Sequence, residues 1–153
     1  MTHQGVRTLN LPVNLKKLRQ KAADIRSALA NLSPYTAMTL DEYLKDRDRV
    51  AASKYYLVVA TEAAIDICNH LAARLAKEAP DSYAECFAIL ARENIISSTL
   101  ADRLIRMAKF RNLLIHLYGN VDDRKVHEII CYNLDDLDLY LTELAVLLKI
   151  DLP

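Results

Sequence analysis

The chain has 153 residues, and its 20 Lys and Arg balance its 20 Asp and Glu, so the formal net charge at pH 7 is zero. A chain of this length typically forms one domain with a substantial hydrophobic core. The balanced charge excludes a globally basic nucleic-acid binder, so any electrostatic binding surface must be local. The presence of only 2 Gly and 4 Pro leaves few turn residues, which favours long helices over β-hairpins.

Apolar positions repeat at helical spacing in five segments, bounded by capping or helix-breaking residues. The five segments are residues 12–33, 39–77, 82–92, 97–118 and 122–148. They predict an all-α fold, an antiparallel bundle of about five helices. The pair Ser33-Pro34 is expected to end the first segment, because proline does not continue a helix well. Residues 1–11 lack the periodicity and are expected to form a flexible N-terminal tail, which leaves residues 12–153 as a single helical domain.

Four of these segments begin at a side chain that commonly caps a helix. Thr39 stands three residues before Glu42, which is the arrangement of a capping box. Ser82, Ser97 and Asp122 precede the next three helical runs and can accept hydrogen bonds from the first free backbone N–H groups. These residues predict where the helices begin.

The three cysteines, Cys68, Cys86 and Cys131, are odd in number and widely spaced, without a C-x-x-C pair. Each lies among apolar neighbours, so we expect buried free thiols in a reducing compartment. No apolar run approaches the roughly 18 residues that cross a bilayer, and no signal peptide is visible. A cytoplasmic protein without membrane contact is therefore expected.

The polar side chains in residues 111–118 interrupt an apolar helical run. Arg111 shares a stripe with apolar positions such as Met107, so either this stripe leaves the core or the arginine meets an anion. His116 lies about 140° round the helix from Arg111, in a polar stripe with Lys109 and Asn112. One straight helix therefore does not bring Arg111 and His116 into a tight site. Two copies of the chain could supply the two groups to each other across a two-fold axis.

These side chains suit metal-independent cleavage of RNA. Histidine can take or give the proton when a ribose 2′-hydroxyl attacks the adjacent phosphate. A fixed arginine can stabilise the charge that develops on the phosphate, and Asn112 can orient the histidine or bond the phosphate. Arg106 and Lys109 are candidate RNA contacts, although a basic run on a helix is often only a solvated face.

Residues 110–118, followed by Val121-Asp122 and an amphipathic helix, resemble the HEPN superfamily of ribonuclease toxins and, within it, the HepT toxins. Residues 55–57 and 62–70 carry the same resemblance, which covers roughly residues 12–150. The R-x4-H-x-Y string is weakly specific alone and gains its specificity from these flanking segments.

The resemblance implies a HEPN-like bundle that acts as an endoribonuclease toxin of a type VII-like toxin–antitoxin pair. It implies a homodimer in which His116 is the acid or base and Arg111 binds the phosphate and stabilises the transition state. Asn112 would support these two residues. It also implies that an MntA-type nucleotidyltransferase antitoxin transfers AMP to Tyr118 and so blocks the RNase cleft. The substrate would be cellular RNA, with tRNA as one candidate, and no metal or cofactor is expected.

A second polar stripe on the most apolar segment contains Glu62, Asp66 and either Asn69 or His70. It could line a cleft opposite Arg111, contact a partner, or satisfy buried polar groups; His70 and Asp66 could also pair across one turn. No Glu-x-x-His motif occurs, which argues against a metal site in the bundle.

Two other functional readings remain open. One is a non-catalytic helical bundle that partners a nucleotidyltransferase. The other is a generic bundle in which the motif arose by chance. A scaffold has no need of Arg111 or His116, which counts against the first, and the extent of the resemblance counts against the second.

Overall fold

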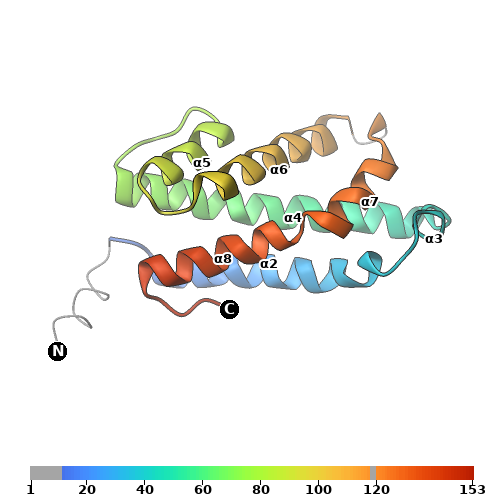
Figure 1. The fold of residues 1–153 in the computed structure, drawn as a ribbon, viewed down its shortest axis with the longest axis horizontal. Helices are drawn as coiled ribbons and strands as arrows, with labels where there is room; N and C mark the ends of the chain where they lie inside the picture. The colour runs from blue at the N-terminus through green and yellow to red at the C-terminus, as the bar shows by residue number, and fades with distance from the viewer. Residues whose placement is uncertain (1–11, 118–119) are drawn as a thin grey trace.

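The computed structural model describes residues 12–117 and 120–153, and it confirms the all-α prediction, with no strand in this part of the chain. Its elements are α2 (Leu15–Thr36), α3 (Leu40–Leu44), α4 (Arg47–Leu71), a π-helical turn (Ala72–Ala76), α5 (Tyr83–Arg92), α6 (Ser98–His116), α7 (Asp123–Tyr132) and α8 (Asp135–Leu148). The longest helices run roughly along one axis, and α4 lies through the middle of the bundle (Figure 1). The expected N-terminal tail, residues 1–11, lies outside the described residues.

Four of the described helices begin at the capping residues that the sequence indicates. Thr39 accepts the Glu42 N–H, and the Glu42 side chain bonds back to the Thr39 N–H, so the capping box is complete. Ser82, Ser97 and Asp122 each accept a backbone N–H of the first turn that follows. Each cap satisfies donors that a helix start would otherwise leave free.

Two of the expected helices are divided, so the described residues contain seven α-helices. Residues 39–77 form α3, α4 and the π-helical turn, because the Asp46 side chain accepts the N–H groups of Asp48 and Arg49 and starts a new helix. Residues 122–148 divide into α7 and α8 at Asn133-Leu134, where hydrogen bonds between residues three apart tighten the chain.

Two expected helix ends differ from the structure. Helix α2 continues through Pro34 to Thr36, two residues beyond the expected stop. A proline so near a helix end removes one backbone hydrogen bond and leaves the rest of the helix intact. Helix α6 ends at His116 instead of residue 118, because the backbone at Leu117 leaves the helical region (φ −125°, ψ 33°).

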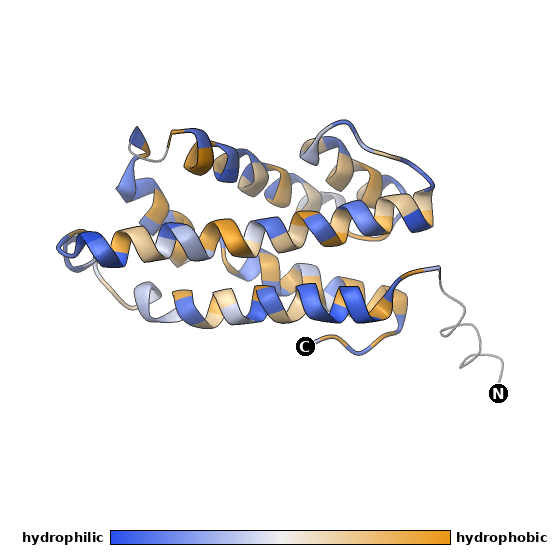
Figure 2. Cartoon of the chain, turned by 180° about the vertical axis from the view of Figure 1, so that it is seen from behind, coloured by the Kyte–Doolittle hydropathy of each residue, from blue (hydrophilic) through white to orange (hydrophobic). Residues whose placement is uncertain are grey.

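The buried side chains form two clusters. The larger one draws on α2, α4, α5, α6 and α8, and it includes Ile25, Ile67 and Leu104. The smaller one, around Leu114 and Val126, joins α2, α3, α4, α6 and α7. Seen from behind the view of Figure 1, α2 and α4 carry both hydrophilic and hydrophobic residues, as amphipathic helices do (Figure 2). Leu114 anchors the end of α6 that carries the motif, since only 1% of its surface is exposed.

The expectation of free thiols was wrong for two of the three cysteines. Cys68 on α4 and Cys86 on α5 form a disulfide, and both are fully buried. The chain reverses direction between these helices and brings the two Cα atoms within 6.2 Å. Cys131 is a free thiol, and burial raises its pKa above the ordinary value.

None of the described helices combines the length and the apolar character that crossing a bilayer requires.

His70 is a buried structural histidine in this fold. Its Nε2 accepts the backbone N–H of Asn14, the N-cap of α2, at 2.9 Å. The predicted alternative, a pair with Asp66, is not formed, because Asp66 bonds to Lys21 instead. The pKa of His70 lies below its ordinary value because burial disfavours the charged ring, and the charges of Arg74 and Lys17 lower it further.

The neutral His70 ring makes stability depend on pH. Above the ordinary histidine pKa of about 6.5 the ring is neutral in both states and its contribution is complete. As the pH falls through the lowered folded pKa, the unfolded chain has already taken up the proton and the free energy of unfolding decreases. Urea unfolding at about pH 7 and about pH 5.5 should therefore show a larger loss for wild type than for His70→Gln, which cannot take up a proton. Equal losses in the two proteins would contradict this role.

Candidate active site

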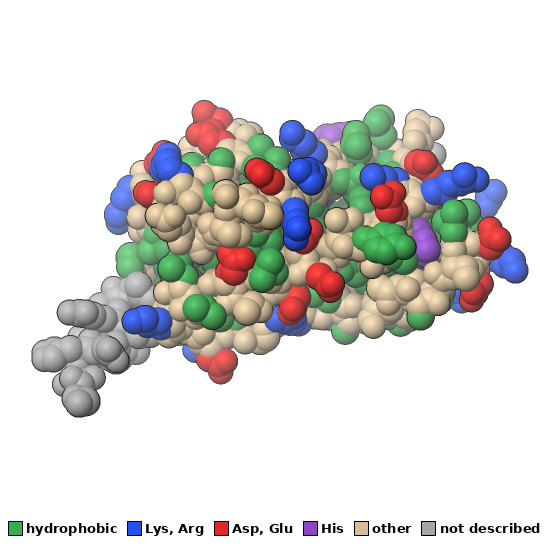
Figure 3. Space-filling model, viewed as in Figure 1, with side chains coloured by type: hydrophobic (Ala, Val, Ile, Leu, Met, Phe, Trp, Pro, Cys, Tyr) green, Lys and Arg blue, Asp and Glu red, His purple; other side chains and the backbone are tan. Residues whose placement is uncertain are grey.

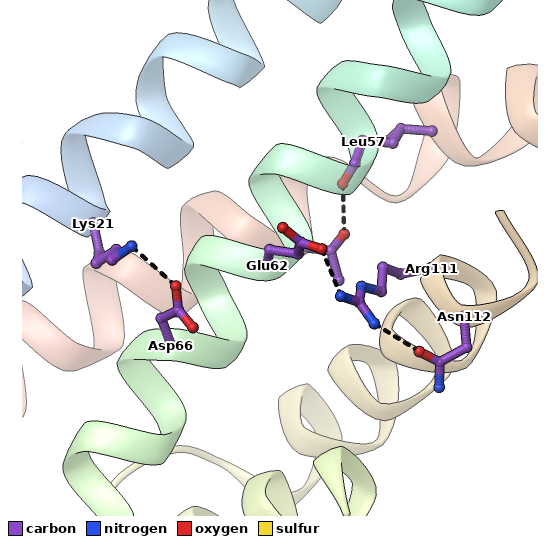
Figure 4. A network of polar contacts seen from close by, with 7 residues as sticks. Lys21, Leu57, Glu62, Asp66, Arg111 and Asn112 are labelled. Atoms are coloured by element: carbon purple, nitrogen blue, oxygen red, sulfur yellow. Dashed lines mark hydrogen bonds and ion pairs between the residues drawn. The ribbon is translucent and has the colours of Figure 1, made fainter. Parts of the chain in front are cut away.

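Arg111 lies on the inner side of α6 and is held by three groups. Its Nη2 donates to Glu62 Oε1 on α4 at 2.5 Å, and its Nη1 donates to Asn112 Oδ1 at 3.0 Å (Figure 4). The guanidinium carbon lies 5.4 Å from the centre of the Tyr83 ring, within the range of a cation–π contact. The arginine therefore meets an anion, one of the two outcomes that its position in an apolar stripe required.

The guanidinium is only partly satisfied by these contacts. Its side chain is 16% exposed, and its Nε–H is buried with no acceptor among the described residues. Glu62 is 46% exposed, so water weakens the ion pair, and we assign it on the order of 1 kcal/mol. The buried Nε–H is not open to a ligand, so a further anion would bind the terminal Nη groups of this oriented side chain.

A cavity of about 280 Å³ opens beside this ion pair. Glu62, Asp66, Tyr83 and Arg111 are among the side chains that line it. Asp66 points from α4 to Lys21 on α2, whose Nζ lies 3.0 Å from its Oδ2 (Figure 4). The hydrogen bond to Asp66 is the largest of the effects that raise the pKa of Lys21. Glu62 and Asp66 therefore line a hollow that Arg111 also borders, and their role in a working cleft stays a prediction.

Asn112 borders a second cavity, of about 450 Å³, on the other side of Tyr83. Lys109 and the start of α5 line the same cavity. The Asn112 amide oxygen is engaged by Arg111, so in a single chain Asn112 supports the arginine.

His116 lies on a different face of α6 from Arg111. It is exposed at the last residue of the helix; Lys109 is exposed on the same side of α6, and the exposed Arg106 lies about 80° round the helix from it. Arg111, by contrast, points to α4. The structure brings together Arg111, Asn112 and Glu62, and it does not bring His116 to them within one chain.

Comparison with known proteins identifies the family of this fold and motif. The family model described as HepT-like, ribonuclease HepT-like, matches residues 25–144, which is most of the chain and includes Arg111 and His116. The chain belongs to the HepT-like ribonuclease family.

Two curated proteins are related in sequence to this HepT-like chain. The tRNA nuclease HepT of Aphanizomenon flos-aquae is 28% identical over 116 residues, which cover 76% of this chain and 79% of that protein. The mRNA nuclease HepT of Shewanella oneidensis is 31% identical over 80 residues, 52% of this chain and 60% of that protein.

Solved structures share the fold at low sequence identity. A tri-AMPylated HEPN toxin from Shewanella oneidensis, in complex with its MNT antitoxin, superposes with a TM-score of 0.78 at 23% identity, covering 85% of this chain and 97% of that one. The cytosolic protein of unknown function YutE from Bacillus subtilis also reaches 0.78, at 17% identity, covering 91% of this chain and 93% of that one. These likenesses establish the HEPN-like fold of the HepT-like chain.

One residue that encloses the site was not predicted from the sequence. Tyr83 supports the guanidinium from α5. The sequence gives little indication of this role, because the contact depends on how α5 packs against α6.

Tyr118, the expected AMP acceptor, lies outside the described residues. Among those residues there is no cluster of three or more His, Cys, Asp or Glu side chains able to hold a metal ion.

Proposed function

We propose that this HepT-like protein is an endoribonuclease toxin of a type VII-like toxin–antitoxin pair, acting on RNA in the cytoplasm. The observation that carries the proposal is the guanidinium of Arg111, which is held by Glu62 and Asn112 and lines a cavity. RNA is the proposed substrate because the curated relatives are a tRNA nuclease and an mRNA nuclease. Transfer RNA is the first candidate, since the tRNA nuclease matches more of the chain.

The proposed reaction is transesterification within the RNA strand. The 2′-oxygen attacks the adjacent phosphorus, the bond from phosphorus to the 5′-oxygen breaks, and a 2′,3′-cyclic phosphate forms. A base takes the 2′-hydroxyl proton and an acid protonates the leaving 5′-oxygen. We assign His116 to this proton transfer and Arg111 to the negative charge on the phosphate, with Asn112 and Glu62 holding the arginine. Because the nucleophile belongs to the substrate, we propose that the reaction needs no metal ion.

We propose that the working enzyme is a homodimer. In one chain Arg111 faces α4 while His116 lies on the exposed side of α6, so a single copy does not present both groups to one phosphate. A two-fold axis near α6 would set the histidine of one copy beside the arginine of the other. The apolar side chains Leu113, Ile115 and Leu117 are 43–48% exposed at this end of α6, as a surface that contacts a second copy would be.

The proposed antitoxin is an MntA-type nucleotidyltransferase that transfers AMP to Tyr118. Adding this enzyme and ATP should silence the wild-type nuclease by at least about tenfold, since the adenylate would add a charged, bulky group two residues along the chain from His116. Tyr118→Phe should show no ATP-dependent loss relative to its own starting rate. Tyr132→Phe, a change at a 79% exposed tyrosine on α7, should be silenced like wild type. Equal silencing of all three proteins would contradict the assignment of Tyr118.

One observation favours the alternative, a non-catalytic module that partners a nucleotidyltransferase. The charge of Arg111 is already matched by Glu62 within the chain, so the arginine also serves the fold. This alternative predicts that the protein binds the nucleotidyltransferase and cleaves no RNA, even when Tyr118 is unmodified.

A further inference from the structure

A groove of about 450 Å³ runs between α6 and α7, and Lys109 lies between it and the cavity that borders Asn112. Its apolar floor includes Met107, Phe110 and Ile129. Four of the lining side chains are basic and two are acidic, so its local charge is positive although the whole chain is neutral. Figure 3 shows several Lys and Arg side chains on this face of the molecule, next to hydrophobic ones.

The cations of the groove differ in how firmly they are engaged. Arg103 is bonded to Asp136, whose side chain is 9% exposed, so this pair belongs to the fold. Lys125 lies 3.5 Å from Glu128, but both side chains are more than half exposed and such a pair is weak in water. Arg106 and Lys109 are exposed on α6. Arg106 and Lys125 therefore present positive charge from the two sides of the groove.

The groove reaches the face of α6 that carries His116 only at its edge, at Lys109, since its α6 side chains centre about 100° round the helix from His116. At 100° per residue, Lys109 is within about 20° of His116 and lies about 10 Å before it along the helix axis. Arg106 lies about 15 Å before His116, beyond the reach of the two nucleotides at a scissile bond. A strand that leaves the groove past Lys109 would therefore approach the histidine.

We propose that the α6–α7 groove is an extended subsite for the sugar–phosphate backbone of single-stranded RNA, on one side of the cleavage point. This inference rests on the proposed function, because it gives the groove the same substrate as His116. Arg106 and Lys125 contact phosphates, and the partly buried Phe110 gives a base a surface to stack on. The positive charge favours a polyanion over an apolar protein segment.

The test is the salt dependence of RNA binding. The probe is a labelled single strand of about 20 nucleotides with 2′-O-methyl groups, which has no nucleophile and is not cleaved. The variant Arg106→Gln/Lys125→Gln is compared with Lys16→Gln/Arg47→Gln, which removes the same charge at exposed positions on α2 and α4. Circular dichroism and thermal unfolding establish that both variants fold like wild type.

Fluorescence anisotropy should show at least about tenfold weaker binding by the groove variant at low salt. The slope of log affinity against log salt should fall in magnitude by about 1.4, because each lost contact with a single strand contributes about 0.7. The control should bind within about twofold of wild type. If wild type cleaves RNA, it should cleave a long RNA more efficiently than a dinucleotide. The groove variant should lose part of this difference in cleavage efficiency.

Equal affinity and equal slope for the groove variant and the control would overturn the proposal. It would also be wrong if the groove variant bound RNA like wild type but changed its oligomeric state in light scattering, since the groove would then be a protein contact. The binding test does not depend on cleavage. Weaker binding by the groove variant, with no cleavage of ordinary RNA by wild type, would refute the nuclease and support the groove.

Discussion

Replacing Arg111 with alanine should lower the rate of RNA cleavage by about 10²–10³-fold, the range found when one fixed donor to a developing negative charge is removed. The guanidinium is held by Glu62, Asn112 and Tyr83, so it meets the phosphate without a cost of reorientation. Arg111→Lys should recover only part of the rate, because an ammonium cannot keep both hydrogen bonds of the planar fork. The measurement is kcat/KM on a labelled tRNA.

The Arg111 variants also change the fold slightly, and two controls separate the effects. Arg111→Ala should reduce the free energy of unfolding by about 1 kcal/mol through loss of the pair with Glu62. Glu62→Ala breaks the same pair but keeps the guanidinium, so its cleavage rate should lie well above that of Arg111→Ala. Arg92→Ala removes a pair between α5 and Glu78, in the loop before α5 and far from the motif, and should leave cleavage unaltered. Cleavage by Arg111→Ala at the rate of Arg92→Ala would refute the role of Arg111.

Replacing His116 with alanine should lower the cleavage rate by about 10²–10⁴-fold, the contribution of a positioned acid or base. The side chain is exposed at the end of α6, so the free energy of unfolding should change by no more than about 0.5 kcal/mol. His116→Gln keeps a polar side chain that cannot transfer a proton near neutral pH, and it should be as impaired as the alanine variant. A His116→Gln protein with wild-type kcat would exclude proton transfer by this residue.

Mixing the two inactive chains tests whether His116 and Arg111 act across a dimer. If each site takes its histidine from one copy and its arginine from the other, a mixed dimer of Arg111→Ala and His116→Ala contains one intact site. Random reassociation makes half of the dimers mixed, so about a quarter of the wild-type activity should return. No recovery after confirmed subunit exchange would place both groups in one chain and contradict the composite site.

The helix starts were predictable because they depend on local chemistry. Thr39, Ser82, Ser97 and Asp122 cap the helices that follow them, as their side chains indicate. The break before α4 was missed because Asp46 lies inside a continuous run of helix-forming residues. Its capping role appears only when its hydrogen bonds to the next turn are seen.

The candidate site was predicted in part. Periodicity required Arg111 either to leave the core or to meet an anion, and it indicated a polar stripe that contains Glu62. That these two residues pair could not be derived, because α4 and α6 are distant in sequence and only their packing brings the side chains together. The same limit applies to Tyr83 beside Arg111 and to the disulfide of Cys68 and Cys86.

The most direct test of the account is cleavage of labelled tRNA by the purified protein in excess EDTA, with and without added Mg²⁺, beside His116→Ala. Tyr118 must first be shown by mass spectrometry to be free of AMP. The account predicts cleavage by wild type at the same rate in both buffers, 2′,3′-cyclic phosphate ends on the products, and none of this activity in the variant. Intact tRNA after incubation with the unmodified wild type, or cleavage that EDTA abolishes, would contradict a metal-independent ribonuclease at Arg111 and His116.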